Sequence, residues 1–343
     1  MSEQEKSVAL PDFAIGAINL ASARLGARAI YATDQFFAPL ARMLKDDSPV
    51  FLPGEYDEHG KWMDGWESRR KREPGHDWAI IRLAMPGRIR GFDIDTTHFT
   101  GNYPPQCSIQ GCFMESGEPD ANADWQDILG VTDLGPSSHH FVELDQEKRQ
   151  MVFTHLRIHI YPDGGIARLR AYGSAYFNWN KVGASEEVDL AYIFGGTHAL
   201  HWSDAHFGHP DRMLAPGRGV NMGDGWETAR RRGPGHDWVI LKLGHPGIIR
   251  RMVVDTAHFK GNFPHSCALL GANLPDQPDV FTDAQIADSE NWTPVLDKTQ
   301  LQADHIHEIS GGAISDIGPV THVRFAIYPD GGVSRLRLYG VKG

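Results

Sequence analysis

The residues best suited to chemistry in this sequence are a carboxylate and an imidazole that lie three positions apart and occur twice. Asp95 precedes His98, and Asp255 precedes His258, in the shared pattern Asp-Thr-x-His-Phe-x-Gly-Asn. An aspartate that orients a histidine is the usual unit for proton transfer near neutral pH. The pattern therefore predicts that His98 or His258 acts as acid and base, oriented by Asp95 or Asp255. The structural alternative is a network of Asx turns that only shapes the loop.

A second repeated block, Asp-Gly-Trp-Glu, lies just before a predicted strand and supplies more carboxylates. Glu67 and Glu227 are predicted as the second proton-transfer group. The alternative is that they form loop ion pairs with the arginines that follow, since such pairs are common. The remaining polar residues of these loops are predicted to bind a neutral, amide-like group of a substrate. These binding residues are Asp64, Asn102, Asp224 and Asn262.

Arginines follow the same block in both copies. Arg70 and Arg72 correspond to Arg230 and Arg232, whereas Arg69 corresponds to an alanine. A planar guanidinium group binds a carboxylate through two parallel hydrogen bonds. We therefore expect these four arginines to bind a carboxylate of the substrate. Arg168 and Arg170, or their repeat partners Arg335 and Arg337, are further candidates for the same role.

A third repeated block, Pro-Gly-His-Asp-Trp, is typical of a turn that enters a strand. His76 and His236 lie at its mouth and are predicted to contact substrate. The alternative is that each histidine caps backbone groups of the turn.

The sequence predicts no cofactor and no protein metal site. Its 18 histidines include suggestive spacings, but none of these sets is duplicated, and HExxH or paired CxxC patterns are absent. A divalent metal is left open, as in a metal-dependent amidohydrolase. A Ser-His-Asp nucleophile, a phosphate-binding glycine loop and a dinucleotide-binding fingerprint are also absent as motifs.

The elements that position these residues are also duplicated. The three blocks recur at one offset, 224 − 64 = 160, which is too long for a solenoid repeat of about 20–50 residues. Short alternating runs joined by glycine and proline turns are typical of antiparallel strands. The sequence therefore predicts an all-β protein of two tandem antiparallel β-sandwich domains. We expect the domains over residues 12–178 and 188–343, with a linker over 179–187.

Composition narrows the partners and the compartment. The formal net charge of −11 disfavours a nucleic acid or an anionic membrane as partner. The three cysteines are sparse and lack a CxxC pair, which favours reduced thiols and a cytoplasmic protein. No apolar run approaches the roughly 20 residues that span a bilayer.

At these blocks the chain resembles the allantoicase (allantoate amidinohydrolase) family. The resemblance rests on Asp-Gly-Trp-Glu-Ser-Arg-Arg, Gly-His-Asp-Trp and Asp-Thr-Thr-His-Phe-Thr-Gly-Asn with their second copies, and on Tyr-Pro-Asp-Gly-Gly. It extends over nearly the whole chain. It implies two jelly-roll, galactose-binding-like domains, and hydrolysis of allantoate to ureidoglycolate and urea in purine catabolism. It also implies a homo-oligomer.

Three questions stay open from sequence. The rival function is a non-catalytic tandem sandwich that binds a small molecule or a carbohydrate through its tryptophans. The repeat also leaves open whether one or both copies are catalytic, and whether an imine forms or water displaces urea directly.

Overall fold

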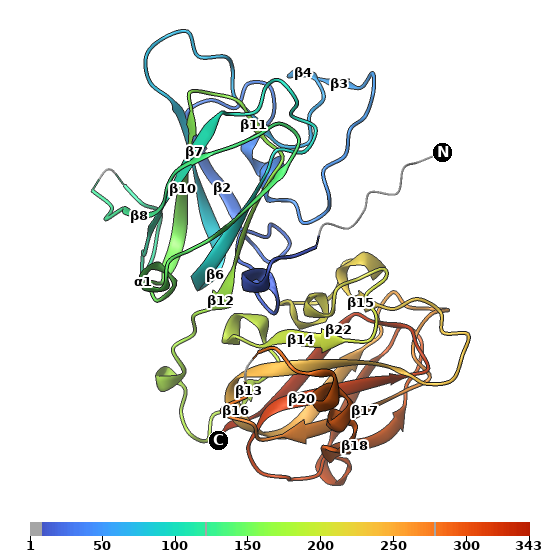
Figure 1. Cartoon of the computed structure of the whole chain (residues 1–343). Coiled ribbons are helices and arrows are strands. Elements are labelled where there is room, and N and C mark those ends of the chain that lie inside the picture. Colours follow the sequence, from blue (N-terminus) through green and yellow to red (C-terminus); the bar gives the residue numbers. More distant parts are fainter. Residues whose placement is uncertain (1–8, 121, 278) are drawn as a thin grey trace. The chain divides into compact units, whose positions relative to one another are not determined.

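The computed structural model describes residues 9–120, 122–277 and 279–343. The chain folds into two compact units, which we call the first and the second repeat; the first ends at Tyr176 and the second begins at Phe177 (Figure 1). Antiparallel sheets make up both units, so the prediction of two tandem all-β domains is confirmed.

The first repeat is built from strands β1 to β12 and three short helices. Its strands are β1 (Ile18–Asn19), β2 (Arg28–Ala32), β3 (Tyr56–Asp57), β4 (Gly60–Lys61), β5 (Trp66–Glu67), β6 (Asp77–Asp95), β7 (Gln106–Cys112), β8 (Gln126–Asp133), β9 (His139–Glu143), β10 (Phe153–Tyr161), β11 (Gly165–Ile166) and β12 (Arg168–Ala175). Its helices are α1 (Gln146–Arg149) and the 3-10 turns η1 (Asp12–Ala14) and η2 (Leu40–Leu44).

The second repeat has the same order of strands without the β3–β4 hairpin. Its strands are β13 (Val188–Asp189), β14 (His198–Trp202), β15 (Trp226–Glu227), β16 (Asp237–Asp255), β17 (Ser266–Ala272), β18 (Thr293–Gln300), β19 (Ile306–Ser310), β20 (Val320–Tyr328), β21 (Gly332–Val333) and β22 (Arg335–Lys342). Its helices are α2 (Asp283–Asp288) and the 3-10 turns η3 (Trp179–Lys181), η4 (Ile193–Gly195), η5 (Pro210–Leu214), η6 (Met222–Asp224), η7 (Ser289–Asn291) and η8 (Gly311–Ala313).

The strand that organises each repeat is long and bends in its middle. In the first repeat, the opening part of β6 pairs with β2 and β10, and its closing part pairs with β9 and β12. The pairing register shifts between these parts, around Pro86 and Gly87. A bent strand of this kind passes from one sheet of a sandwich to the other. Asp95 therefore ends the strand in the layer formed by β9, β6, β12 and β1.

The inward face follows the alternation seen in the sequence. Phe92, Ile94 and Ile158 have no exposed surface, and Met252 and Phe325 are buried likewise in the second repeat. Because every second residue of a strand points to the same face, these positions form the core of each sandwich.

The opposite face of β12 is more buried than the alternation of its residues predicts. Alternation places Arg168, Arg170 and Tyr172 outward, yet Arg168 and Tyr172 are buried. The loop before β3 contributes Asp47, whose carbonyl accepts from Arg168 Nε at 2.9 Å, and Phe13 packs edge-on against Tyr172. A second set of side chains thus lies between this sheet and the segments that cover it.

Within the described part of the chain, no helix is long and apolar enough to cross a membrane.

Candidate acid–base site

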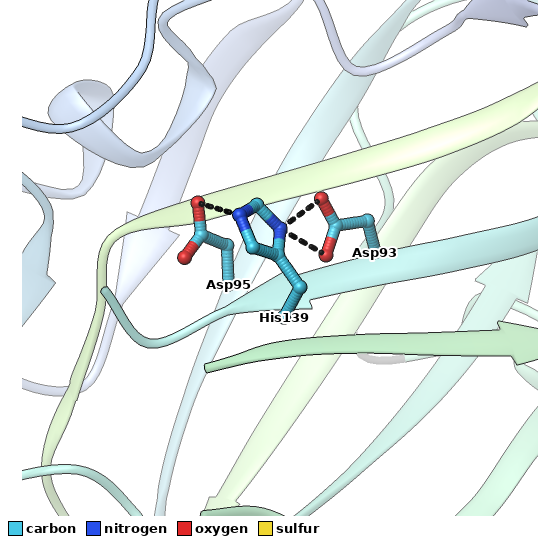
Figure 2. Close-up of side chains that lie close together, drawn as sticks. All are labelled: Asp93, Asp95 and His139. Carbon is cyan, nitrogen blue, oxygen red and sulfur yellow. Dashed lines mark hydrogen bonds and ion pairs between the residues drawn. The ribbon is translucent and has the colours of Figure 1, made fainter. Parts of the chain in front are cut away.

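A histidine lies between two buried aspartates on this covered face of the first repeat (Figure 2). Asp93 and Asp95 are adjacent outward positions of β6, and His139 opens β9 directly across from Asp95. His139 Nδ1 lies 3.0 and 3.1 Å from the two oxygens of Asp93, and its Nε2 lies 3.9 Å from Asp95. Asp93 and Asp95 have almost no exposed surface, whereas His139 is 26% exposed. The cluster therefore reaches solvent through the imidazole.

Arg170 joins the two aspartates from the neighbouring strand. Its Nη1 lies 2.9 Å from Asp93 and 3.4 Å from Asp95. With a protonated His139, the four side chains carry two negative and two positive charges. A balanced set of this kind tolerates burial far better than isolated charges.

The geometry favours the protonated form of His139. The hydrogen bond to Asp93 raises the pKa of His139, and the charges of Asp93 and Asp95 add to this effect against the opposing effects of burial and Arg170. A raised pKa extends the pH range over which His139 holds a proton that it can donate to a reacting group.

The second repeat has no counterpart of Asp93 or of His139. Val253 occupies the position of Asp93, and Ile306 lies across from Asp255 where His139 lies across from Asp95. The counterpart of Arg170 is Arg337, which pairs with Asp189 instead. The two copies are therefore chemically different on this face.

A metal ion is a weaker match to the cluster than proton transfer. The ligand atoms of Asp93, Asp95 and His139 lie within 4.8 Å of one another, which is close enough for one cation. Arg170, however, already places a positive charge on both carboxylates. A metal also needs a free imidazole nitrogen, and Asp93 favours the protonated ring.

Glu67 and Asn102 form a hydrogen-bonded pair, as do their second copies. Asn102 Nδ2 donates to Glu67 at 2.7 Å, and Asn262 donates to Glu227. Burial raises the pKa of both glutamates, although the asparagine hydrogen bond opposes it. Each pair offers a carboxyl and a carboxamide side by side, which complement a ureido group.

The predicted substrate residues Asp64 and Asp224 are buried ion-pair partners. Asp64 accepts from Arg168 Nη2 at 2.6 Å and from Lys45 at 2.7 Å, and Asp224 accepts from Arg335 at 2.7 Å. Burial alone would raise the pKa of Asp64, but the bonds from Arg168 and Lys45 outweigh it and hold that pKa low. These contacts fix the loop that precedes β5 onto β12.

The side chain of His98 does not contact Asp95 within the described part of the chain. Its Nε2 lies 3.1 Å from the carbonyl of Pro49, and the corresponding nitrogen of His258 lies 2.9 Å from that of Gly219. Asp95 instead accepts the backbone N–H of Thr97 and contacts His139 and Arg170. Both loop histidines also share a positive φ, 71° and 72°. This arrangement holds one loop against another.

His76 lies in a different group, on the outer face of β10. Its Nε2 is 2.9 Å from His159 Nδ1, and its ring lies 4.6 Å from that of Tyr161. His236 stacks on Tyr328 at 4.5 Å. Burial lowers the pKa of both His76 and His236. Neither histidine contacts the Asp93–His139 cluster within the described residues.

The four arginines predicted to bind carboxylate are exposed. The side chains of Arg70, Arg72, Arg230 and Arg232 form no hydrogen bond or ion pair within the described part of the chain. The structure brings them to none of the groups above.

The sequence patterns did not identify Asp93 or His139 as site residues. They also did not identify the contacts that Arg170 makes with the cluster. Asp93 and His139 are not repeated in the second copy, where Val253 and Ile306 stand, so the duplication does not mark these positions. Alternation along β6 could have placed Asp93 on the face of Asp95. His139 carried no such signal, because its place depends on β9 pairing with a strand 44 residues earlier.

Known proteins resemble this chain over nearly its whole length. A model of the allantoicase repeat matches residues 18–176 and 188–343. A probable allantoicase of Rhizobium meliloti is 54% identical over 96% of both chains, and one of Photobacterium profundum is 51% identical over 95% of this chain and 96% of its own. The crystal structure of allantoicase from Saccharomyces cerevisiae is 35% identical with a TM-score of 0.78, covering 95% of this chain and 93% of that one. A second solved allantoicase structure is 34% identical with a TM-score of 0.80 and covers 95% and 94%.

Proposed function

This chain belongs to the allantoicase family and hydrolyses allantoate to ureidoglycolate and urea in purine catabolism, and we propose that the first repeat alone performs the turnover. The observation that carries this proposal is the Asp93–His139–Asp95 cluster, whose positions 93 and 139 are occupied by valine and isoleucine in the second repeat. A non-catalytic binding protein is the weaker reading, because relatives over the full length are named as the enzyme.

In the proposed reaction, His139 donates one proton to the leaving nitrogen and later accepts one proton from water. Its imidazolium donates a proton to the ureido nitrogen that leaves, the bond between that nitrogen and the central carbon breaks, and urea departs with the electron pair. The oxygen of water bonds to the central carbon, and the proton of that water returns to His139. The balance is the same whether an imine forms first or water displaces urea directly. Asp93 stabilises the charged ring before the first transfer and after the second.

Two further groups hold the substrate in this proposal. Arg170 contacts both aspartates through Nη1 only, and the rest of its guanidinium makes no hydrogen bond within the described chain. We assign that free edge to the substrate carboxylate, for which a planar guanidinium is suited. Glu67 and Asn102 take a ureido arm; β11 places Glu67 across from Gly165, close in sequence to Arg168 and Arg170 on β12.

We propose that the reaction needs no metal, because Arg170 and protonated His139 together already balance the charges of Asp93 and Asp95. Purified protein is therefore expected to release urea from allantoate at the same rate, within about twofold, before and after treatment with a chelator. The measurement is urea produced per unit time, with the metal content of the treated sample determined in parallel. A large chelator-dependent loss that Mn²⁺ or another divalent ion restores would contradict the metal-free proposal. Absence of urea in both samples would contradict the function.

Two finer expectations remain proposals. We place the enzyme in the cytoplasm, supported by three buried free cysteines, and cell fractionation tests this.

We also propose a homo-oligomer. Exposed apolar side chains recur at matching positions of the two repeats, namely Phe37 and Phe207, Val50 and Val220, and Leu52 and Met222. Light scattering that returns the 38.1 kDa monomer mass would contradict the oligomer.

A further inference from the structure

The second repeat keeps one half of the proposed site and lacks the other. Glu227 and Asn262 reproduce the hydrogen-bonded pair of Glu67 and Asn102, with a raised pKa at both glutamates. The proton-transfer residues are replaced by Val253 and Ile306. A site of this composition can recognise a ureido group, but it has no counterpart of His139 to protonate a leaving nitrogen.

The pair is also more open in the second repeat. The loop before Glu67 carries the β3–β4 hairpin, whereas the loop before Glu227 is shorter by 170 − 160 = 10 residues. Glu67 is buried, and Lys61 at the end of that hairpin acts on its charge. Glu227 is only partly buried. A ligand therefore reaches the second pair without displacing a hairpin.

The shorter loop brings a cation that the first repeat lacks. Arg218 stands where the first repeat has Ser48; its side chain is 61% exposed and its Nε lies 3.4 Å from Asp255. The same loop continues through Gly219, whose carbonyl meets His258, to Met222, whose sulfur lies 4.0 Å from Asn262 Nδ2. One short segment thus connects a solvent-facing guanidinium to the carboxyl–carboxamide pair.

We propose that the second repeat is a non-catalytic binding site for an anionic ureide, a small carboxylate that carries a ureido arm. Arg218 takes the carboxylate, and Glu227 with Asn262 takes the ureido group. The inference rests on the proposed function for its assignment of turnover to the first repeat.

The test is the number of binding sites for N-carbamoylglycine, which has a carboxylate and a single ureido arm and so lacks the second arm that departs as urea. Titration calorimetry on the full chain is expected to give two sites per chain. Glu227→Ala removes one site, and Arg218→Ala weakens one site by at least about tenfold. Arg250→Ala, at an exposed arginine of the same repeat, keeps both sites unchanged.

One site in the wild type, or two sites that survive both Glu227→Ala and Arg218→Ala, would overturn the proposal. Arg218 is exposed, so its variant reports on binding even where Glu227→Ala unfolds the repeat. The proposed function is tested separately. Full turnover in a His139 variant would refute catalysis by the first-repeat cluster. The number of binding sites would still show whether the second repeat binds a ureide.

Discussion

Replacing His139 by alanine is expected to lower kcat/KM for allantoate by about 10²–10⁴-fold, the usual contribution of a positioned acid or base. The reason is geometric: His139 is the imidazole that both buried aspartates face, and its Nδ1 lies 3.0 Å from Asp93. The measurement is the initial rate of urea release over a range of allantoate concentrations. Circular dichroism and the thermal midpoint confirm that the variant is folded.

Two matched variants make this comparison selective. His305→Ala removes an exposed histidine just before β19, the second-repeat counterpart of β9, and is expected to keep wild-type kinetics. His98→Ala removes the loop histidine that contacts Pro49 and is expected to act mainly through stability. A large loss of activity with His98→Ala and none with His139→Ala would assign proton transfer to the loop histidine instead.

The second large effect concerns the buried ion pair of Asp64 and Arg168. Their side chains are 3% and 1% exposed, and Arg168 also donates to three backbone carbonyls of the covering loop. Asp64→Ala leaves a buried guanidinium without its counter-charge, which costs about 3–5 kcal/mol. We expect the thermal midpoint of the first repeat to fall by roughly 6–20 °C, measured by calorimetry.

The control for this prediction is a pair of the same type at the surface. Glu143 pairs with Arg149, and its side chain is 55% exposed. Glu143→Ala is expected to cost at most about 1 kcal/mol, because water screens such pairs. Equal shifts of the midpoint in Asp64→Ala and Glu143→Ala would show that the buried pair is no anchor for the loop.

Local sequence patterns predicted the fold well, because alternation is a local property. Phe92, Ile94 and Ile158 were recognisable as core positions from their spacing alone, and the structure buries all three. The covered outer face was not recognisable. Burial of Arg168 depends on a loop that precedes it by about 120 residues, and alternation along a strand carries no information about what lies above it.

The candidate site was predicted in part, and the part that was missed is instructive. Asp64 and His98 were chosen because both copies keep them, and both side chains hold loops in place in the structure. A duplicated scaffold needs the same loop contacts twice. A catalytic group needs to be kept only in the copy that turns over substrate, so a search for matching residues passes over Asp93 and His139.

Proton donation by His139 under the control of Asp93 is tested by the pH dependence of kcat/KM. Asp93 raises the pKa of His139, so the acid form is present at low pH and activity falls as pH rises through that pKa. Asp93→Asn removes the charge and keeps the shape. We expect the alkaline limb of the profile to move to lower pH in this variant, because the hydrogen bond and charge that raise the pKa of His139 are lost. An alkaline limb that stays in place, with activity retained, would contradict the account.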